Sequence, residues 1–305
     1  MKRFFLTAAI ITACSLNLMS QDSKSTRNIK GDFNRIEIGY HFDATVEQAS
    51  GNSAEIEFST ELEPYIIAKV SGGTLYLTLD EQKMRNIKKR RDFERMSAYT
   101  TLKAHIKVRN LTEVECNGTS NVSFNGKFKG QELELELNGV SKVNVESFDF
   151  GNIEISASGV SECRITDLTA DNCEIDISGG SKVRVKGQSS IVDAELSGSS
   201  NISIENPALA ERINMSLSGA SAAELSGKCK VLNAELSGAS SCDALKLIAD
   251  NAYIKGSGAS KISVDAKMIS GVDISGASRL NITKETVMSS SLSISGAASI
   301  KTVNK

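Results

Sequence analysis

Hydrophobic and polar residues alternate along most of this 305-residue chain, in short runs that lead into a glycine. Counted back from the glycine, alternate residues are apolar, as with Leu135 and Leu137 before Gly139. Counted forward, the fourth and sixth residues repeat the pattern, as with Val143 and Val145. A period of two is typical of a β-strand with one buried face. Each glycine is therefore predicted to form a corner between two strands.

The corner motif recurs ten times after residue 115, with 18 to 21 residues from one glycine to the next. Most copies read Ser-Gly-x-Ser, and Gly accepts a positive φ without steric cost. The corner glycines are Gly118, Gly139, Gly159, Gly179, Gly198, Gly219, Gly238, Gly258, Gly276 and Gly296. A fixed period of this length is typical of a solenoid.

The period also narrows the class of solenoid. Helical repeats need about 30 residues or more per unit, and the leucine-rich consensus does not match this spacing. We predict an all-β fold, a parallel β-helix whose coils take about 20 residues each. One further apolar residue per coil is interpreted as a short third side, represented by Phe128, Phe148, Leu168, Leu209, Ile248 and Met268.

The region before the first corner motif also has the pattern of β-structure. Alternating or β-branched runs predict strands at 35–38, 44–48, 54–58, 65–70, 74–79 and 102–108. A turn is predicted at 71–73, and the stretch 80–99 could form a helix or an exposed loop. Because a solenoid needs an atypical end unit, we assign 21–115 to an N-terminal β cap with irregular first coils. Residues 116–305 are assigned to the regular β-helix with ten coils.

Four stretches of the N-terminal region, followed by Ser-Gly-Ala-Ser coils, resemble a known family. They are 33–38, 42–48, 61–66 and 73–77, and the combination is similar to the putative auto-transporter adhesin family with a head GIN domain. The resemblance runs from about Asn28 to the last residue. It implies an exported right-handed β-helix of a family abundant in Bacteroidetes. The basic insert at 83–95 departs from the family pattern.

The first residues predict export from the cytoplasm. Lys2 and Arg3 precede an apolar run at 4–13, which is typical of a signal peptide, assigned here to 1–20. Cleavage after Ser20 would release the protein, whereas acylation of Cys14 in a lipobox-like context would anchor it. No later segment is long enough for a transmembrane span. We expect the protein in the periplasm, on the cell surface or secreted.

The other cysteines mostly stand where other coils carry Val, Ile or Leu, and they are interpreted as small buried hydrophobes. They are Cys116, Cys163, Cys173, Cys229 and Cys242. A disulfide between Cys163 and Cys173 is left open. With two histidines and no CxxC motif, neither a zinc site nor another cofactor is predicted.

The formal net charge is only −2, but the charged residues gather into an acidic patch and a basic patch. Outward positions before the corners form an acidic column of Glu113, Glu115, Glu134, Glu136, Glu154, Glu174, Asp176, Asp193 and Glu195. The column could bind Ca²⁺ or a polycation, or it could be a solvated face that keeps the rod soluble.

The basic patch gathers Lys83, Arg85, Lys88, Lys89, Arg90, Arg91 and Arg95 within one segment. These cations could bind an acidic glycan or a phosphate of the cell envelope, or they could form an exposed loop without a specific partner. Nucleic acid is not expected as a partner, because the chain is predicted to be exported and has few aromatic residues.

Catalysis has to be considered because parallel β-helices include polysaccharide lyases and hydrolases. Glu134 and Glu154 would stand at the roughly 5 Å spacing of a retaining glycosidase. Every neighbouring pair of the acidic column has that spacing, and nothing separates the two pKa values of such a pair. No catalytic residue is assigned. We predict a noncatalytic, adhesin-like protein that binds carbohydrate or another envelope component; the alternatives are a polysaccharide-degrading enzyme and a structural spacer of the envelope.

Overall fold

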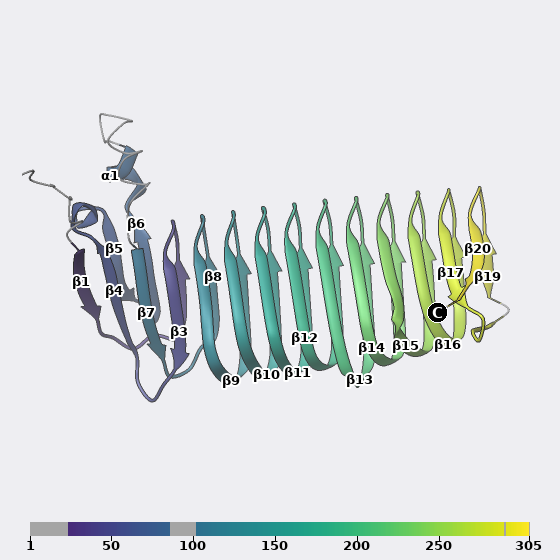
Figure 1. The fold of residues 1–305 in the computed structure, drawn as a ribbon, viewed down its shortest axis with the longest axis horizontal. Helices are drawn as coiled ribbons and strands as arrows, with labels where there is room; N and C mark the ends of the chain where they lie inside the picture. Colours follow the sequence, from purple (N-terminus) through teal and green to yellow (C-terminus); the bar gives the residue numbers. More distant parts are fainter. Residues whose placement is uncertain (1–23, 86–101, 290, 305) are drawn as a thin grey trace, which may run out of the picture.

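The computed structural model describes residues 24–85, 102–289 and 291–304, which form one rod of stacked coils (Figure 1). Within these residues the middle of the rod consists of long strands, each running from one corner to the next. They are β9 (Asn121–Leu137), β10 (Lys142–Ala157), β11 (Glu162–Ile177), β12 (Lys182–Leu196), β13 (Asn201–Leu217), β14 (Ala222–Leu236), β15 (Ser241–Gly256) and β16 (Lys261–Ile274). Each pairs in parallel with the next, so the predicted all-β parallel solenoid is confirmed.

Each long strand bends between its two halves, and the pairing register shifts there, as between Val145 and Ser147 where β10 meets β9. The bend gives every coil two broad outward surfaces. We call the outward side of the half that leads into a corner the pre-corner face. The outward side of the half that leaves a corner is the post-corner face.

The corner glycines adopt the positive φ that the motif predicts, with values from 68° to 77°. They stack directly on one another along the rod. Ala220 donates its N–H to the carbonyl oxygen of Gly198 at 2.8 Å. A Cβ atom on Gly219 would lie 2.6 Å from that oxygen. The corners therefore require glycine for close stacking as well as for φ.

The serine two residues after each of the first nine corner glycines is buried. In several coils its hydroxyl closes the corner, as where Ser221 Oγ donates to the carbonyl oxygen of Ser218 at 2.8 Å. The tenth corner has Ala298 in this position. The serine of the motif thus supplies a hydrogen bond across the turn, because a buried backbone carbonyl needs a donor.

A further corner precedes the first glycine motif. Strand β2 (Arg35–Ile38) pairs in parallel with β8 (Glu113–Cys116), and β3 (Asp43–Gln48) pairs in parallel with β9. Tyr40, with φ of 65°, lies at the corner between β2 and β3, and Thr119 donates its N–H to the Tyr40 carbonyl at 2.7 Å. The corner column therefore begins one coil earlier than the glycine motif.

The N-terminal end of the rod combines antiparallel and parallel strand pairs. The remaining elements there are β1 (Lys24–Ile29), β4 (Ser53–Ser59), the 3-10 turn η1 (Thr60–Leu62), β5 (Ile66–Ser71), β6 (Thr74–Leu79), α1 (Glu81–Arg85) and β7 (Leu102–Val108). Strand β4 lies antiparallel between β1 and β7, and β5 and β6 form a hairpin. The six predicted strands and the turn at Gly72 and Gly73 are confirmed. The polar strand β1 was not predicted.

Among the described residues, no helix is both long enough and apolar enough to cross a bilayer.

At the C-terminal end the coil divides into short strands, β17 (Arg279–Thr283), β18 (Val287–Met288), β19 (Leu292–Ile294) and β20 (Ser299–Val303). Leu292 and Ile294 are exposed there.

The core follows the rod as columns of inward side chains. Leu196, Leu217 and Leu236 stack in register on β12, β13 and β14, and each is at most 2% exposed. Burial of one leucine contributes about 1.5–3 kcal/mol. In β9 and β10 the core is aromatic, and Phe124 contacts Phe128 and Phe148 edge to face, with ring centroids 5.4 Å apart in both pairs.

The prediction for the third side is right for the first three coils and wrong for the later ones. Phe128, Phe148 and Leu168 are buried, but Leu209, Ile248 and Met268 are 52%, 41% and 42% exposed. The register shifts between Asn206 and Leu209 and between Ala244 and Ile248 change which residue points inward. In those coils the next residue along the chain is buried instead: Ala210, Ala249 or Ile269.

The five described cysteines are buried free thiols, as the interpretation as small hydrophobes predicts. Cys163 and Cys173, left open as a pair, are not bonded to each other. Burial raises the pKa of Cys173 to about 12, with a smaller contribution from the charge of Asp193. These thiols stay protonated and pack as apolar groups.

Candidate functional site

The predicted basic patch is only partly within the described residues. Lys83 and Arg85 lie in α1, where Lys83 Nζ is 3.5 Å from Asp80 Oδ2 and Arg85 Nη2 is 3.0 Å from Glu81 Oε2. Each of these two cations therefore has an acidic neighbour. Lys88, Lys89, Arg90, Arg91 and Arg95 lie outside the described residues, so polyanion binding by this segment stays a prediction.

The acidic column lies on the pre-corner face, in the register that the spacing predicts. Glu134, Glu154 and Glu174 lie directly opposite one another on β9, β10 and β11. The column begins one coil earlier than predicted, because Glu37 of β2 lies opposite Glu115 of β8. Among the described residues, no group of three or more His, Cys, Asp or Glu side chains is arranged to hold a metal ion. Nothing in the described residues decides between the two interpretations of the column, a cation-binding stripe and a solvated face.

Burial and the neighbouring charges raise the pKa of two carboxylates of the column. The pKa of Glu136 is raised above its ordinary value, first by burial and then by the neighbouring charge of Glu115. The pKa of Glu154 is raised in the same way, by burial and then by the charges of Glu134 and Glu174. Glu154 thus has a carboxylate on each side within the column.

We expect Glu136→Gln to raise the free energy of unfolding at neutral pH by a few tenths of a kcal/mol, because it removes a like charge from the column. Folding raises the pKa of Glu136, so its ionisation costs stability above the folded pKa. The cost disappears as the pH falls toward the ordinary value of 4.5, and the gain of the variant should disappear with it. Urea unfolding of wild type and variant at about pH 7.5 and about pH 4 measures this difference.

Glu285→Gln is the matched control, since Glu285 is exposed and lies in the turn after β17, outside the column. It should give no pH-dependent gain. A Glu136→Gln variant that is less stable than wild type at neutral pH would show that the carboxylate is held by favourable contacts.

The pre-corner face is hollowed into two adjoining depressions of about 360 and 500 Å³. They share Glu195 and Ser216, and together we call them the pre-corner groove. The first is lined by Asn138, Ser156, Ala157, Ser158, Asp176, Ile177, Ser178, Glu195, Leu196, Ser197, Ser216 and Ser218. The second is lined by Glu174, Asp193, Ala194, Glu195, Asn214, Met215, Ser216, Asn233, Ala234, Glu235, Tyr253 and Lys255. The groove thus follows the rod from the corner after β9 to β15.

Side-chain amides connect neighbouring coils inside the groove. Asn233 Nδ2 donates to Asn214 Oδ1 at 2.6 Å, and Asn214 Nδ2 donates to Asp193 Oδ1. At the other end of the groove, Ser158 Oγ donates to Asn138 Oδ1 at 2.7 Å. These ladders hold the donors and acceptors of the groove in fixed orientations.

Tyr253 supplies an aromatic surface at the C-terminal end of the groove. Its side chain faces outward from β15, and the residue is 46% exposed. A Cβ atom on Gly271 of the next coil would lie 3.4 Å from Tyr253 Cδ1, which is ordinary van der Waals contact with the ring. Lys255 Nζ lies 3.4 Å from Glu235 Oε2 next to it. The groove therefore combines hydrogen-bonding groups with one half-exposed ring.

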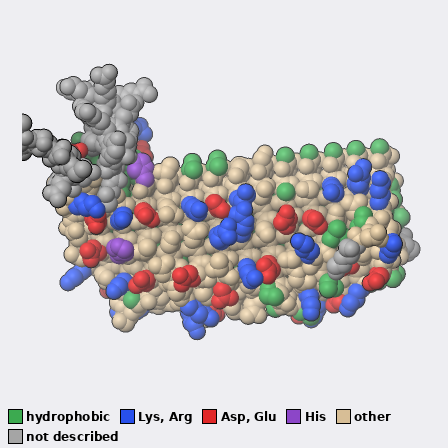
Figure 2. All heavy atoms as spheres, in the orientation of Figure 1, with side chains coloured by type: hydrophobic (Ala, Val, Ile, Leu, Met, Phe, Trp, Pro, Cys, Tyr) green, Lys and Arg blue, Asp and Glu red, His purple; other side chains and the backbone are tan. Residues whose placement is uncertain are grey.

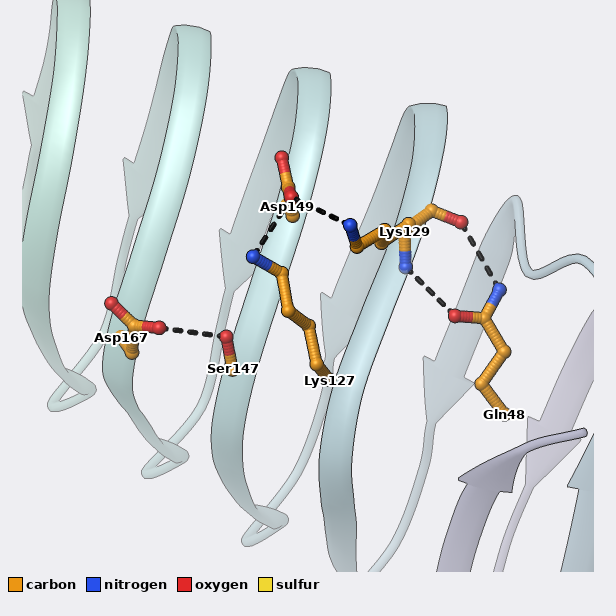
Figure 3. A network of polar contacts seen from close by, with 6 residues as sticks. All are labelled: Gln48, Lys127, Lys129, Ser147, Asp149 and Asp167. Atoms are coloured by element: carbon orange, nitrogen blue, oxygen red, sulfur yellow. Dashed lines mark hydrogen bonds and ion pairs between the residues drawn. The ribbon is translucent and has the colours of Figure 1, made fainter.

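A second polar network lies where β3 meets the long strands (Figure 3). Gln48 accepts from the Lys129 backbone N–H at 2.9 Å and donates to the Lys129 carbonyl at 3.1 Å. Lys127 Nζ lies 2.9 Å from Asp149 Oδ2, and its hydrogen bond lowers the pKa of Asp149. These groups bond to one another across β3, β9 and β10, which indicates a structural role.

The comparison with protein families decides the identity of this solenoid. The family model described as "Putative auto-transporter adhesin, head GIN domain" matches residues 32–208 and residues 208–286. The chain belongs to this family. The two matches include the corner column from Tyr40 to Gly276, so the resemblance stated from the sequence is confirmed. No curated protein matches this adhesin-family chain.

Two solved structures share the fold over most of their length. One, described as a putative adhesin from Parabacteroides distasonis, has 17% sequence identity and a TM-score of 0.55, and the match covers 93% of this chain and 98% of that one. The other, described as a putative lipid binding protein from the same organism, has 18% identity and a TM-score of 0.50, with the same coverage. At these identities the likeness concerns the fold.

The acidic column predicted from the sequence includes four carboxylates of the groove, Glu174, Asp176, Asp193 and Glu195, but Glu235 and the other groups of the groove were missed. Tyr253, Asn214 and Asn233 occupy one outward column in which the earlier coils carry carboxylates. This change of residue type was visible in the repeat alignment. The hollow itself does not follow from the repeat, because it depends on how the stacked coils are arranged in three dimensions.

Proposed function

We propose that the protein is a noncatalytic, exported binding module of adhesin type, and that the pre-corner groove binds a neutral carbohydrate chain. The groove carries this proposal because it is long, open and lined by fixed amides, carboxylates and serines. Carboxylates accept and side-chain amides both donate and accept, which suits the hydroxyl groups of a sugar. The Tyr253 ring offers an apolar surface to one face of a sugar ring.

The charge of the groove supports a neutral ligand. The lining of the groove includes the carboxylates of Glu174, Asp193 and Glu195. The cation in this lining is Lys255, which already lies close to Glu235. An anionic chain in the groove would meet like charges at short range, which is unfavourable. The open shape of the groove suits a polymer that lies along the rod and crosses several coils.

The lipid-binding description of one structural neighbour finds less support in this chain. The groove floor is interrupted by carboxylates, and an acyl chain would desolvate them. A small pocket beside Leu168 and Asn206 measures about 10 Å³, which is far too small for an acyl chain. Carbohydrate therefore fits the described residues better than lipid.

Export is part of this proposal. The signal segment at 1–20, with Cys14 as an alternative acylation site, lies outside the described residues. Membership of the adhesin family supports a location outside the cytoplasm, and the neighbours from Parabacteroides support a Bacteroidetes-type envelope. An adhesin of this kind would act in the periplasm, at the cell surface or after secretion.

We expect Tyr253→Ala to weaken binding of a neutral glycan by about tenfold, because the substitution removes the stacking surface. A glycan array identifies the best neutral ligand, and calorimetry then compares wild type with the variant. Met268→Ala is the matched control, since Met268 is a large apolar side chain of similar exposure outside the groove. It should leave the affinity unchanged.

The same array separates the three functional classes. Assays for reducing sugar and for unsaturated uronide on every bound glycan test for turnover. Binding without turnover supports the proposal, and release of product would favour the polysaccharide-degrading enzyme. Absence of binding to every glycan would contradict the proposal and favour a structural spacer.

A further inference from the structure

A cationic cluster lies on the post-corner face, on the opposite side of the corners from the pre-corner groove. Alternate outward residues of β12 are Lys182, Arg184 and Lys186, which stand roughly 6.6 Å apart along one strand. Arg164 of β11 lies directly opposite Arg184. Lys142 of β10 completes the cluster. Figure 2 shows Lys and Arg side chains gathered near the middle of this face.

The pairing within the cluster leaves positive charge uncompensated. Glu162 lies between Lys142 and Lys182 in register and forms ion pairs with Lys142 at 3.9 Å and with Arg184 at 2.8 Å. Lys186 is paired with Glu205 at 2.9 Å. Within the described part of the chain, Arg164 and Lys182 have no carboxylate within ion-pair distance.

The stacking of Arg164 on Arg184 costs free energy unless something binds there. Like charges directly opposite on neighbouring strands destabilise a sheet. The same column has Asn144 on the preceding strand and Ser203 on the following strand, so a small polar side chain satisfies the fold at this position. Two adjacent guanidinium groups are therefore not required by the solenoid. They match the bidentate geometry of carboxylate recognition.

Acidic residues limit the direction in which a ligand could extend. Toward the C-terminal end, Glu205 on β13 and Glu224 on β14 face outward, and toward the N-terminal end Asp43 does so on β3. An anionic polymer lying along the rod axis would meet these charges. A segment lying across the rod, along β12, would meet Lys182, Arg184 and Lys186 in succession.

We propose that this cluster binds a short segment of an acidic polysaccharide, with its carboxylates on Arg164 and Arg184 and its chain directed across the rod along β12. The surrounding outward residues are small and polar, such as Asn201 and Ser203, and offer no ring on which a base could stack. The exposed apolar side chains beside the cluster are Val140 and Val160 at the corners, and two valines offer little surface for insertion into a bilayer. The site is distinct from the pre-corner groove and goes beyond the neutral-glycan function proposed for that groove.

The test measures binding of an oligogalacturonate of defined length to the purified full chain at low and at physiological salt. A neutral maltooligosaccharide of equal length, an oligo-dT and vesicles of anionic phospholipid are the comparison ligands. We expect affinity for the oligogalacturonate to fall with added salt, since exposed charges are screened. Tighter binding of oligo-dT or of the vesicles than of the oligogalacturonate would overturn the assignment to polysaccharide.

The decisive variant combines Arg164→Ser and Arg184→Ser, which copies the serine found at Ser203 in the same column. We expect it to bind oligogalacturonate at least about tenfold more weakly, because each lost charge-assisted hydrogen bond contributes more than a neutral one. Its thermal midpoint should match or exceed that of wild type. The matched control combines Arg279→Ser and Lys301→Ser, which removes the same charge from the same face at the C-terminal end.

The control variant should bind oligogalacturonate with an affinity within about twofold of wild type. This change is well below the roughly tenfold loss expected for the Arg164→Ser, Arg184→Ser variant. Equal losses in the two variants would show that only net charge matters and would overturn the proposal. Full binding by the Arg164→Ser, Arg184→Ser variant would also overturn it and would assign the anion to another part of the chain. Binding of the neutral maltooligosaccharide should be the same in both variants, which separates this site from the groove.

Discussion

Gly219→Val should lower the free energy of unfolding by about 3 kcal/mol or more. Gly219 has φ of 71°, a conformation that β-branched residues rarely adopt. A Cβ atom there would also lie 2.6 Å from the carbonyl oxygen of Gly198. That oxygen accepts the Ala220 N–H and cannot move away without breaking the corner ladder. Thermal and urea unfolding followed by circular dichroism measure the loss.

Ala220→Ser is the control for this corner. Ala220 is exposed, and Ser199 occupies the equivalent position one coil earlier, so the change should be nearly neutral. Gly219→Ala should fall between the two, because it introduces the close contact without β-branching. Wild-type stability of Gly219→Val would mean that the corner can open without cost, against the stacking described above.

Tyr40 shows which part of the glycine requirement comes from stacking. It lies at the first corner of the column with φ of 65°, and it carries a large side chain. The strand that pairs with β2 toward the N-terminal end of the rod is β6, and β6 leads into α1 and not into another corner. The Tyr40 side chain therefore does not meet a stacked corner carbonyl, whereas a side chain on Gly118 would lie 2.9 Å from the Tyr40 oxygen.

Leu217→Asp should destabilise the protein by about 3–5 kcal/mol, the cost of a buried charge without a partner. Leu217 is 1% exposed and stacks between Leu196 and Leu236. Among the described residues no Lys or Arg is buried, so the new charge would have no partner in the core. Urea unfolding gives the magnitude, and hydrogen exchange should show the loss of protection centred on β12, β13 and β14.

Ser216→Asp is the adjacent control, because Ser216 points outward from the same strand. It lies in register between Glu195 and Glu235, so the new carboxylate adds a like charge and should cost up to about 1 kcal/mol. Ser216→Asn should be close to neutral. Similar losses for Leu217→Asp and Ser216→Asp would mean that the inward and outward positions are assigned wrongly.

The regular coils could be predicted from the sequence because one short pattern is repeated. Alternation and a fixed glycine spacing are local properties, and they name the buried residue at almost every position next to a corner. The bends carry no such pattern. Phe128 and Leu209 look equivalent in the sequence, yet Phe128 is buried and Leu209 is 52% exposed, because the strand register shifts after Asn206.

The candidate sites follow the same division. The acidic column was predictable because residues one period apart must stack. The opposition of Arg164 and Arg184 follows the same rule, but its meaning depends on Glu162 being shared between Lys142 and Arg184. Such sharing is decided by side-chain reach, which a repeat pattern does not describe.

By itself the sequence determined the family, the parallel solenoid, the corner glycines and the inward columns, because each follows from a repeat of about 20 residues read locally. Only the tertiary structure decided that Tyr40 begins the corner column, that the later bends turn Leu209, Ile248 and Met268 outward, and that the pre-corner face is hollow. The physical reason is that these features depend on contacts between coils. Residues that are far apart in the chain together determine the strand register and the packing of side chains there.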